Sequence, residues 1–256
     1  MLKLKQEKLR LNNDIEHLDG GRKLSPFFFG RNMKYENIVK GVYLDRPNRF
    51  IAHCLIDDKE EICHVKNTGR CKELLVKGNT VYLQKSDKTN RKTKYDLIAV
   101  EKGERLINMD SQIVNNVVLE YLPNIFDYIK FVKPEYKYGN SRFDIYVETE
   151  NEKAFIEVKG VTLENGGVVS FPDAPSERGV KHLKELQKAV TEGFKAYVIF
   201  VIQMSDVKYF EPNSKTHPEF AEELKKAKDN GVIPLAFDCA VTPDSIEIRK
   251  PVLIKI

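Results

Sequence analysis

Residues 141–160, SRFDIYVETENEKAFIEVKG, carry the pattern that decides the fold. Apolar residues concentrate at positions 143–148 and again at positions 154–159, and both segments have the length of a β-strand. The four residues between them at 150–153, Glu-Asn-Glu-Lys, are polar and predict a turn. The stretch therefore predicts a hairpin of two antiparallel strands.

Two carboxylates and a lysine converge in this hairpin. Successive side chains of a strand point to opposite faces, so Glu157 and Lys159 share one face of the second strand. Because the chain returns antiparallel, Asp144 of the first strand is expected near Glu157. Gly160 follows directly, and a glycine there allows a substrate backbone to approach closely.

The chemistry of this cluster favours a divalent cation. Two neighbouring carboxylates repel each other unless a cation is present, and Mg²⁺ prefers oxygen ligands. A bound Mg²⁺ or Mn²⁺ would polarise a phosphodiester and acidify a water molecule. We therefore predict Asp144 and Glu157 as metal ligands and catalytic residues. Lys159 is predicted as the third catalytic residue, which orients the water and offsets negative charge. As a bare pattern, the same three residues also fit an ion pair at the edge of a sheet.

The segments around the hairpin predict an α/β domain over residues 110–256. Apolar residues at near-helical spacing over 111–122 predict a helix that Pro123 stops. Ser176 is typical of the residue that caps a helix N-terminus. The other predicted elements are a third short strand at 168–171, a helix from 176 to 192, a buried strand at 197–204, a helix from Pro218 to Gly231, and strands at 234–237 and 245–249.

Residues 33–109 show the sequence pattern of a small β-barrel. Short strand-like segments alternate with turns, and one helical turn at 71–75 interrupts them. So many strands in so short a segment suit an OB-like barrel, although another small barrel fits the pattern equally well. Residues 1–32 form a polar N-terminal extension to which the sequence assigns no function. The predicted strands are 36–45, 49–56, 61–65, 80–84, 95–101 and 105–107, with a turn at 46–48.

The composition is that of an ordinary soluble protein, with 41% hydrophobic and 31% charged residues. No apolar run is long enough to cross a membrane, and the N-terminus lacks the apolar core of a signal peptide. These features predict a cytoplasmic protein without membrane contact. The pairs His53–Cys54 and Cys63–His64 are adjacent in strands, so their side chains diverge. A zinc site is therefore not expected, and the cysteines are predicted to be buried thiols.

Basic residues concentrate in the barrel segment. Residues 66–94 contain nine Lys or Arg against two acidic residues, which favours a face for a polyanion; a solvated loop is the alternative. Loops of OB-like barrels usually bind nucleic acid, although Asn67 and Thr68 also suit a tight turn. In the second domain, Arg178 and His182 share a helix face that can meet phosphate. The predicted nucleic-acid-binding residues are Arg46, Arg49, Asn67, Thr68, Arg70, Lys85, Arg91, Lys92, Arg178 and His182.

The order of elements in residues 110–256 resembles the PD-(D/E)XK nuclease superfamily. The core of that superfamily is a helix, a three-stranded meander, a helix and a strand. On this resemblance, Asp144, Glu157 and Lys159 match the signature positions. Glu120 matches the acidic helix residue found in many members, which implies that it is a further metal ligand.

Four motifs occur in order along the chain: DRPNRF at 45–50, HVKNTGR at 64–70, SRFD at 141–144 and FPDAPSERG at 171–179. Together they resemble the sugar fermentation stimulation protein A family over nearly the whole chain from Met33 onward. The resemblance implies a mixed α/β protein, with an N-terminal OB-like barrel and a C-terminal PD-(D/E)XK nuclease-like α/β domain. It also implies largely non-specific DNA binding and a regulatory role in sugar metabolism, notably that of maltose.

Two functions compete for this sequence. The favoured one is a Mg²⁺- or Mn²⁺-dependent nuclease whose barrel holds nucleic acid, with DNA preferred, over the metal site. The main alternative is a catalytically silent, largely non-specific DNA-binding transcriptional regulator. The intact Asp144, Glu157 and Lys159 favour the nuclease, and a protein-interaction module would leave the basic segment unexplained. The sequence does not specify the oligomeric state, whether the nucleic acid is single- or double-stranded, or whether cleavage is endo- or exonucleolytic.

Overall fold

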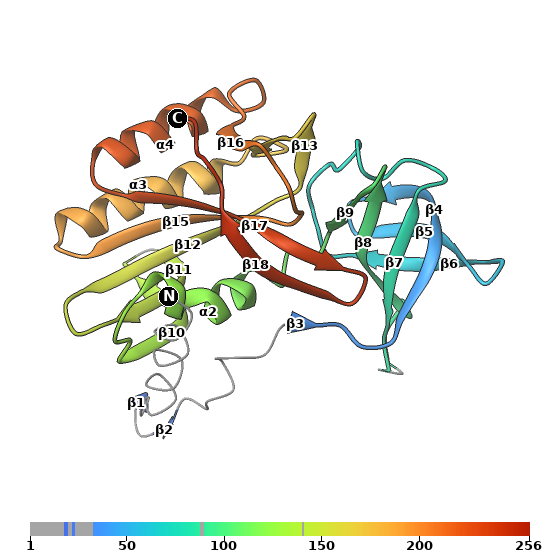
Figure 1. Cartoon of the computed structure of the whole chain (residues 1–256), viewed down its shortest axis with the longest axis horizontal. Coiled ribbons are helices and arrows are strands. Elements are labelled where there is room, and N and C mark those ends of the chain that lie inside the picture. Colours follow the sequence, from blue (N-terminus) through green and yellow to red (C-terminus); the bar gives the residue numbers. More distant parts are fainter. Residues whose placement is uncertain (1–17, 20–21, 24–32, 88–89, 140) are drawn as a thin grey trace.

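The protein consists of a β-barrel beside a larger α/β domain (Figure 1). The mixed α/β class predicted from the sequence is confirmed. The predicted extension, residues 1–32, lies mostly outside the described residues. Within it, β1 (Leu18–Asp19) and β2 (Arg22–Lys23) are described and form an antiparallel pair. The computed structural model describes residues 18–19, 22–23, 33–87, 90–139 and 141–256.

The barrel is a single sheet of six strands. Their order is β6-β5-β4-β7-β8-β9, and a parallel pairing of β6 with β8 closes β4 to β8 into a ring. Alternate residues point inward and are buried, such as Ala52, Cys54 and Ile56. The predicted OB-like barrel is thereby confirmed. The strands are β4 (Ile38–Asn48), β5 (Ile51–Ile56), β6 (Lys59–Val65), β7 (Thr80–Lys85), β8 (Tyr95–Lys102) and β9 (Arg105–Asn108).

The first barrel strand is longer than predicted. The sequence predicts a turn at residues 46–48, but β4 continues through this segment and the turn follows at Arg49 and Phe50. Register shifts on both sides of Asp45 leave Pro47 outside the ladder. A proline is tolerated at such a bulge because it has no N–H to donate.

The α/β domain is a seven-stranded mixed sheet covered on both faces. The strand order is β10-β11-β12-β15-β17-β18-β3, and β12, β15 and β17 are parallel to one another. Helix α2 packs on one face, and α3 and α4 pack on the other (Figure 1). The elements are α2 (Val114–Ile125), β10 (Phe131–Tyr138), β11 (Ser141–Glu148), β12 (Lys153–Val161), α3 (Glu177–Thr191), β15 (Lys195–Ile202), α4 (Pro218–Asp229), β17 (Ile233–Thr242), β18 (Ser245–Pro251) and β3 (Met33–Lys34).

The three-stranded meander of this sheet differs from the predicted one. It consists of β10, β11 and β12, and β10 is not predicted from the sequence. β10 is an edge strand that contains Pro134 and exposes polar side chains, so its apolar pattern is weak. The predicted third strand forms β14 (Val168–Phe171) of a separate sheet, with β13 (Leu163–Asn165) and β16 (Tyr209–Pro212).

Local sequence signals set the ends of α3 and α4. Ser176 Oγ accepts a hydrogen bond from the Gly179 N–H at 3.2 Å, which confirms the predicted cap. α4 begins at Pro218, as predicted. The φ angles of Gly193 and Gly231, just beyond the two helices, are 90° and 92°, and this left-handed region favours glycine.

The predicted stop of α2 at Pro123 is wrong, because the helix continues to Ile125. A proline in the last turn removes only one backbone hydrogen bond. The Phe126 N–H still donates to Leu122 O at 2.8 Å, so the turn closes around the proline.

The N-terminal boundary of the barrel also differs from the predicted range. β3, which lies within the predicted barrel segment 33–109, pairs with β18 of the other sheet. The Tyr35 N–H donates to Asp244 O at 2.7 Å and continues this contact. The chain therefore completes the α/β sheet before it enters the barrel at β4.

Two further features that the sequence pattern addresses are the state of the cysteines and the character of the helices. All four cysteines are buried thiols, as predicted. In the part of the chain that the structure describes, no helix combines the length and the apolar character needed to cross a membrane.

Candidate functional site

The site begins where β11 and β12 separate. Their last ladder pair is Ile145 with Ile156, so Asp144 and Glu157 are the next residues along each strand. Beyond this point, among the described residues, β12 pairs with β15 alone. The Val158 N–H donates to Asp144 Oδ2 at 2.8 Å, so the carboxylate takes the place of a ladder acceptor. The two carboxylates therefore meet at the mouth of the gap between the strands.

Glu157 and Lys159 lie on the face of β12 that α3 covers, as the alternation predicts. Glu157 is only 2% exposed. Its Oε1 accepts from Lys159 Nζ at 2.5 Å and contacts Nδ1 of His182. Its Oε2 is buried and has no hydrogen-bond partner among the described residues. Glu157 therefore has one oxygen, Oε1, that contacts two side chains and one oxygen, Oε2, that has no partner among the described residues.

The two carboxylates differ in electrostatic environment. Burial raises the pKa of Asp144, and the charge of Glu157 raises it further. Burial also opposes ionisation of Glu157, but Lys159 and His182 outweigh burial and hold the pKa of Glu157 below its usual value. One carboxylate is thus stabilised as an anion, and a cation placed beside the other would favour its ionisation.

A pocket of about 480 Å³ lies over these carboxylates and is lined by both domains. The barrel contributes Arg49 and the loop residues Asn67 and Thr68. The α/β domain contributes Lys159, the segment 170–176 and Arg178. Together with Asp144 and Glu157, the structure therefore brings seven of the predicted nucleic-acid-binding and catalytic residues to one cavity.

Arg46 has a different role from the one predicted. Its guanidinium donates to the backbone oxygens of Arg49 and Asn67, both at 2.6 Å, and to that of Gly69 at 2.9 Å and that of Arg70 at 3.1 Å. These bonds tie the β4–β5 turn to the loop that follows β6. Arg46 thus holds the two barrel loops together, and its two terminal Nη groups are occupied by backbone oxygens.

The remaining basic residues of the barrel lie apart from this pocket. Arg70 is exposed but does not line it. Lys85 and Arg91 line a second pocket of about 500 Å³ that shares no residue with the first. Arg91 is bonded to Asp96, which raises the pKa of Arg91, and Lys92 is exposed. These four predictions of nucleic-acid contact therefore do not join the carboxylate site.

The prediction that Glu120 belongs to the metal site is wrong. Its carboxylate accepts from the backbone of Met33 and lies near Glu247, and it does not line the pocket. The helix residue that does reach the site is Asn115, whose Nδ2 donates to Asp144 Oδ1 at 3.1 Å. Five residues along a helix rotate a side chain by roughly 140° from its starting direction, so Glu120 and Asn115 cannot share a face. The available signal was the pair of asparagines, Asn115 and Asn116, in the first turn of the helix.

The two predicted nucleic-acid-binding residues of α3, Arg178 and His182, differ in exposure. Arg178 is exposed and lines the pocket, and its contact with a phosphate stays a prediction. His182 is 5% exposed and lies behind Glu157, so it does not meet a phosphate directly. Burial of a residue on an amphipathic helix depends on the neighbouring strand, which the sequence pattern did not specify.

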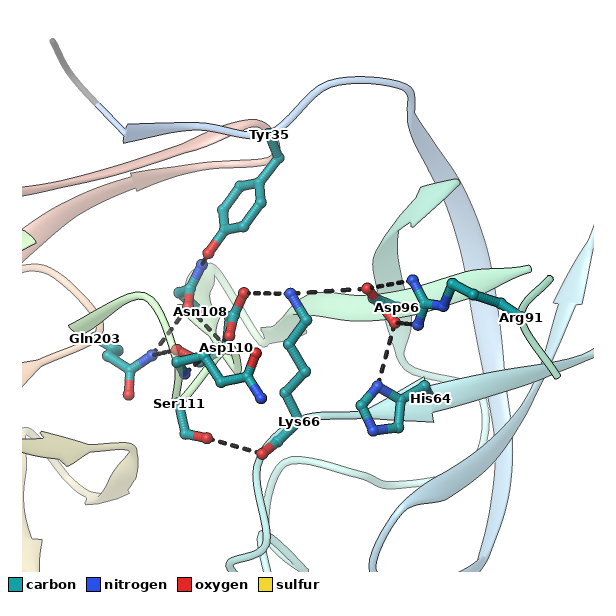
Figure 2. Close-up of polar contacts among 10 residues, drawn as sticks. Tyr35, His64, Lys66, Arg91, Asp96, Asn108, Asp110, Ser111 and Gln203 are labelled. Atoms are coloured by element: carbon teal, nitrogen blue, oxygen red, sulfur yellow. Dashed lines mark hydrogen bonds and ion pairs between the residues drawn. The ribbon is translucent and has the colours of Figure 1, made fainter. Parts of the chain in front are cut away.

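Sequence reasoning also missed Gln203, at the end of β15. Its Nε2 donates to Asn108 Oδ1 at 2.9 Å and to Asp110 O at 3.0 Å, which links it to the domain junction (Figure 2). A Cβ added at Gly160 would lie 2.6 Å from Gln203 Oε1. The close approach that Gly160 permits is therefore made by Gln203, a pocket residue of the protein itself.

Two family models match the chain. The SfsA N-terminal OB domain matches residues 44–109, and the sugar fermentation stimulation protein RE domain matches residues 108–245. A relative from Clostridium beijerinckii, named sugar fermentation stimulation protein homolog, is 62% identical over 219 residues, which cover 85% of this chain and 97% of the relative. A relative of the same name from Ruminiclostridium cellulolyticum is 58% identical over 226 residues, 88% of this chain and 100% of the relative.

A solved structure extends the likeness to three dimensions. SfsA from Pyrococcus furiosus, solved in complex with Ca²⁺, aligns with a TM-score of 0.79 at 27% sequence identity. The alignment covers 89% of this chain and 100% of that chain. Both domains are thus matched in order and nearly in full, and the chain belongs to the sugar fermentation stimulation protein (SfsA) family.

Proposed function

We propose that the protein binds nucleic acid, with DNA as the preferred substrate, and hydrolyses phosphodiester bonds with a divalent cation, Mg²⁺ or Mn²⁺. The observation that carries this proposal is the buried, unpaired Oε2 of Glu157 beside the carboxylate of Asp144. A buried carboxylate oxygen without a partner is costly. A cation bound between the two side chains would satisfy the oxygen and offset the repulsion that raises the pKa of Asp144.

The residues present fit Mg²⁺ or Mn²⁺. Asp144 and Glu157 Oε2 supply hard oxygen ligands, and the pocket leaves room for the water ligands that these ions retain. When bound, such an ion polarises the phosphodiester and lowers the pKa of a water molecule. Asn115 and the Val158 N–H hold Asp144 in place from two sides, so this ligand is positioned in advance.

Lys159 supplies the positive charge on the protein side of the pocket. Its Nζ is held 2.5 Å from Glu157 Oε1, and its side chain is 14% exposed. A cation fixed there faces a phosphate in the pocket and stabilises the negative charge that grows as the phosphodiester is attacked. The same ammonium group can orient the attacking water.

Substrate binding follows from the groups at the pocket rim. Arg49 from the barrel and Arg178 from α3 can each neutralise a phosphate. Asn67 and Thr68 can donate hydrogen bonds to the backbone of the nucleic acid. Contacts with phosphates position a strand but carry no direct sequence information, so binding is expected to be largely non-specific.

Two features of the relatives bear on this proposal. The Pyrococcus furiosus structure contains Ca²⁺, which like Mg²⁺ takes oxygen ligands. The name of the relatives refers to sugar fermentation, which favours an alternative in which the protein regulates sugar genes through DNA binding alone. Cleavage separates the two functions, because the alternative needs the fold and the arginines but not the carboxylates.

The test compares the wild type with Asp144→Ala on supercoiled and single-stranded DNA, with Mg²⁺, with Mn²⁺ and with a chelator. The proposal predicts cleavage by the wild type with either ion and none by the variant or with the chelator. DNA affinity, measured in parallel with the chelator present, should be similar for both proteins. If both proteins bind DNA and neither cuts any substrate, the regulatory alternative replaces the proposal.

A further inference from the structure

A chain of hydrogen bonds leads from the pocket rim to the proposed metal ligand. The Arg178 Nε–H donates to Nε2 of His182 at 3.3 Å, and Nδ1 of His182 contacts Glu157 Oε1. Arg178 and His182 are one turn apart on α3, and the Ser176 cap fixes where that helix starts. The exposed arginine is thereby connected through a buried ring to the buried carboxylate.

The arginine also determines which ring nitrogen carries the proton. A guanidinium can only donate, so Nε2 of His182 must accept and therefore has no hydrogen. Nδ1 consequently carries the hydrogen and donates it to Glu157 Oε1. This assignment follows from the donor character of Arg178 and needs no assumption about the histidine itself.

The contacts have a consequence for Glu157. Lys159 and His182 both donate to Oε1, which leaves Oε2 as the oxygen without a partner. A lysine alone has a flexible stem and can follow the carboxylate as it rotates, whereas a buried ring on a helix cannot. His182 therefore fixes the rotation of the Glu157 carboxylate.

We propose that Arg178 and His182 are positioning residues that hold Glu157 with Oε2 toward the divalent cation and connect that cation to a bound phosphate. The inference rests on the proposed function, because it concerns the metal ligand of the same site. Among the described residues, none accepts from the terminal Nη groups of Arg178, so they are available to a phosphate while Nε holds the ring. Binding of nucleic acid and binding of the cation then strengthen each other.

The first test measures Mn²⁺ affinity by electron paramagnetic resonance in the folded, nucleic-acid-free protein. Removing a group that orients a metal ligand typically weakens metal binding by roughly 10–100-fold, and this loss is expected for His182→Leu. His182→Asn, whose amide can donate from the position of Nδ1, should restore affinity close to that of the wild type. His53→Leu, on the barrel, is the control and should bind as the wild type does. Wild-type affinity in His182→Leu, or no rescue by asparagine, would overturn the inference.

The second test determines which ring nitrogen of His182 carries the hydrogen, by nitrogen NMR of the metal-free wild type labelled at histidine. The inference predicts a protonated Nδ1 and an unprotonated Nε2 for His182, and a loss of this preference in Arg178→Lys, which keeps the charge but lacks the Nε donor. A hydrogen on Nε2 in the wild type would overturn it. If the wild type shows the expected ring but binds no Mn²⁺, the proposed function fails while the hydrogen-bond assignment stands, so the two failures are distinguishable.

Discussion

At the scale of single residues, the opposite pKa shifts of Asp144 and Glu157 follow from their neighbours. Glu157 is buried and Asp144 is half-buried, but only Glu157 has two cationic or donating side chains on one oxygen. Asp144 has neutral donors, Asn115 and a backbone N–H, so burial and the nearby anion dominate. The site thus combines one stable anion with one carboxylate that gains most from a cation.

Lys159→Ala should separate catalysis from binding. The ammonium group is proposed to stabilise the transition state, so its removal is expected to slow single-turnover cleavage by roughly 10²-fold or more. DNA affinity should change little, because the phosphate contacts proposed for Arg49 and Arg178, which line the pocket, remain. Fluorescence anisotropy and single-turnover cleavage under the same conditions measure the two quantities. An equal loss in affinity and in rate would assign the lysine to binding instead.

Glu120, which the site does not use, should affect stability in a pH-dependent way. Burial and the charge of Glu247 raise the pKa of Glu120 from 4.5 to about 7. Between these values the folded protein keeps a proton that the unfolded chain has lost, so the free energy of unfolding falls as pH rises through this window. Glu120→Gln should remove this part of the decline in urea unfolding series from pH 4.5 to 8. An unchanged pH dependence in the variant would contradict the assignment.

The sequence could predict the carboxylates and the lysine because strand alternation is a local property. It placed Glu157 and Lys159 on one face correctly, and the antiparallel return placed Asp144 beside them. It could not predict which helix residue reaches the site, since the rotation of α2 is fixed by packing on the sheet. The same limit applied to His182, whose burial depends on contact between α3 and β12.

At the scale of elements, the hydrogen bonds of Arg46 connect the β4–β5 turn to the loop after β6 and so stabilise the barrel side of the pocket. The sequence grouped Arg46 with Arg49 as phosphate contacts, because both lie in one motif and carry the same charge. The structure separates them: Arg46 donates to four backbone oxygens, whereas the Arg49 side chain lines the pocket.

Arg46→Ala and Arg49→Ala should therefore differ in their effects: the first should lower the free energy of unfolding, and the second should lower DNA affinity. Removing Arg46 leaves four carbonyl groups without their donor, and we expect the free energy of unfolding to fall by about 2–3 kcal/mol. Removing Arg49 should leave unfolding unchanged and weaken DNA binding. Chemical denaturation and a binding titration on each variant measure the contrast. Equal stability of the two variants would show that the loop contacts of Arg46 carry little energy.

The elements that the sequence predicted well are those with strong local signals. The hairpin, the capped helix α3 and the proline-started α4 were found, because alternation and capping act within a few residues. The edge strand β10 and the true meander were not found. An edge strand with polar outer residues and a proline has no apolar pattern to detect, and its pairing partner is set by the sheet.

At the scale of the whole molecule, ion pairs and hydrogen bonds fix the barrel against the α/β domain. Glu164 accepts from Lys102 at 2.7 Å and from Arg105 at 2.8 Å, and both are barrel residues. At a second point of the junction, Lys66 Nζ lies 2.7 Å from Asp110 Oδ2 (Figure 2). The pocket needs side chains from both domains, so these contacts maintain its shape.

A pocket rimmed by arginines from two domains should bind DNA with a strong salt dependence. Each neutralised phosphate releases counterions, so the logarithm of affinity should fall linearly with the logarithm of salt concentration. Arg49→Ala and Arg178→Ala should each lower that slope by about one phosphate contact. Lys184→Ala, on the exposed face of α3, is the control and should keep the wild-type slope. Affinity that does not depend on salt would count against phosphate-driven binding altogether.

Anomalous scattering at the manganese edge, from crystals soaked with Mn²⁺, would locate the cation of the proposed metal site. We predict a peak coordinated by the carboxylate of Asp144 and by Oε2 of Glu157, and the loss of that peak in Asp144→Ala. A second group of possible ligands, Glu177, His217 and Glu219, has ligand atoms within 4.8 Å of one another. A peak there with none between Asp144 and Glu157, or no peak at all, would contradict the proposed metal site.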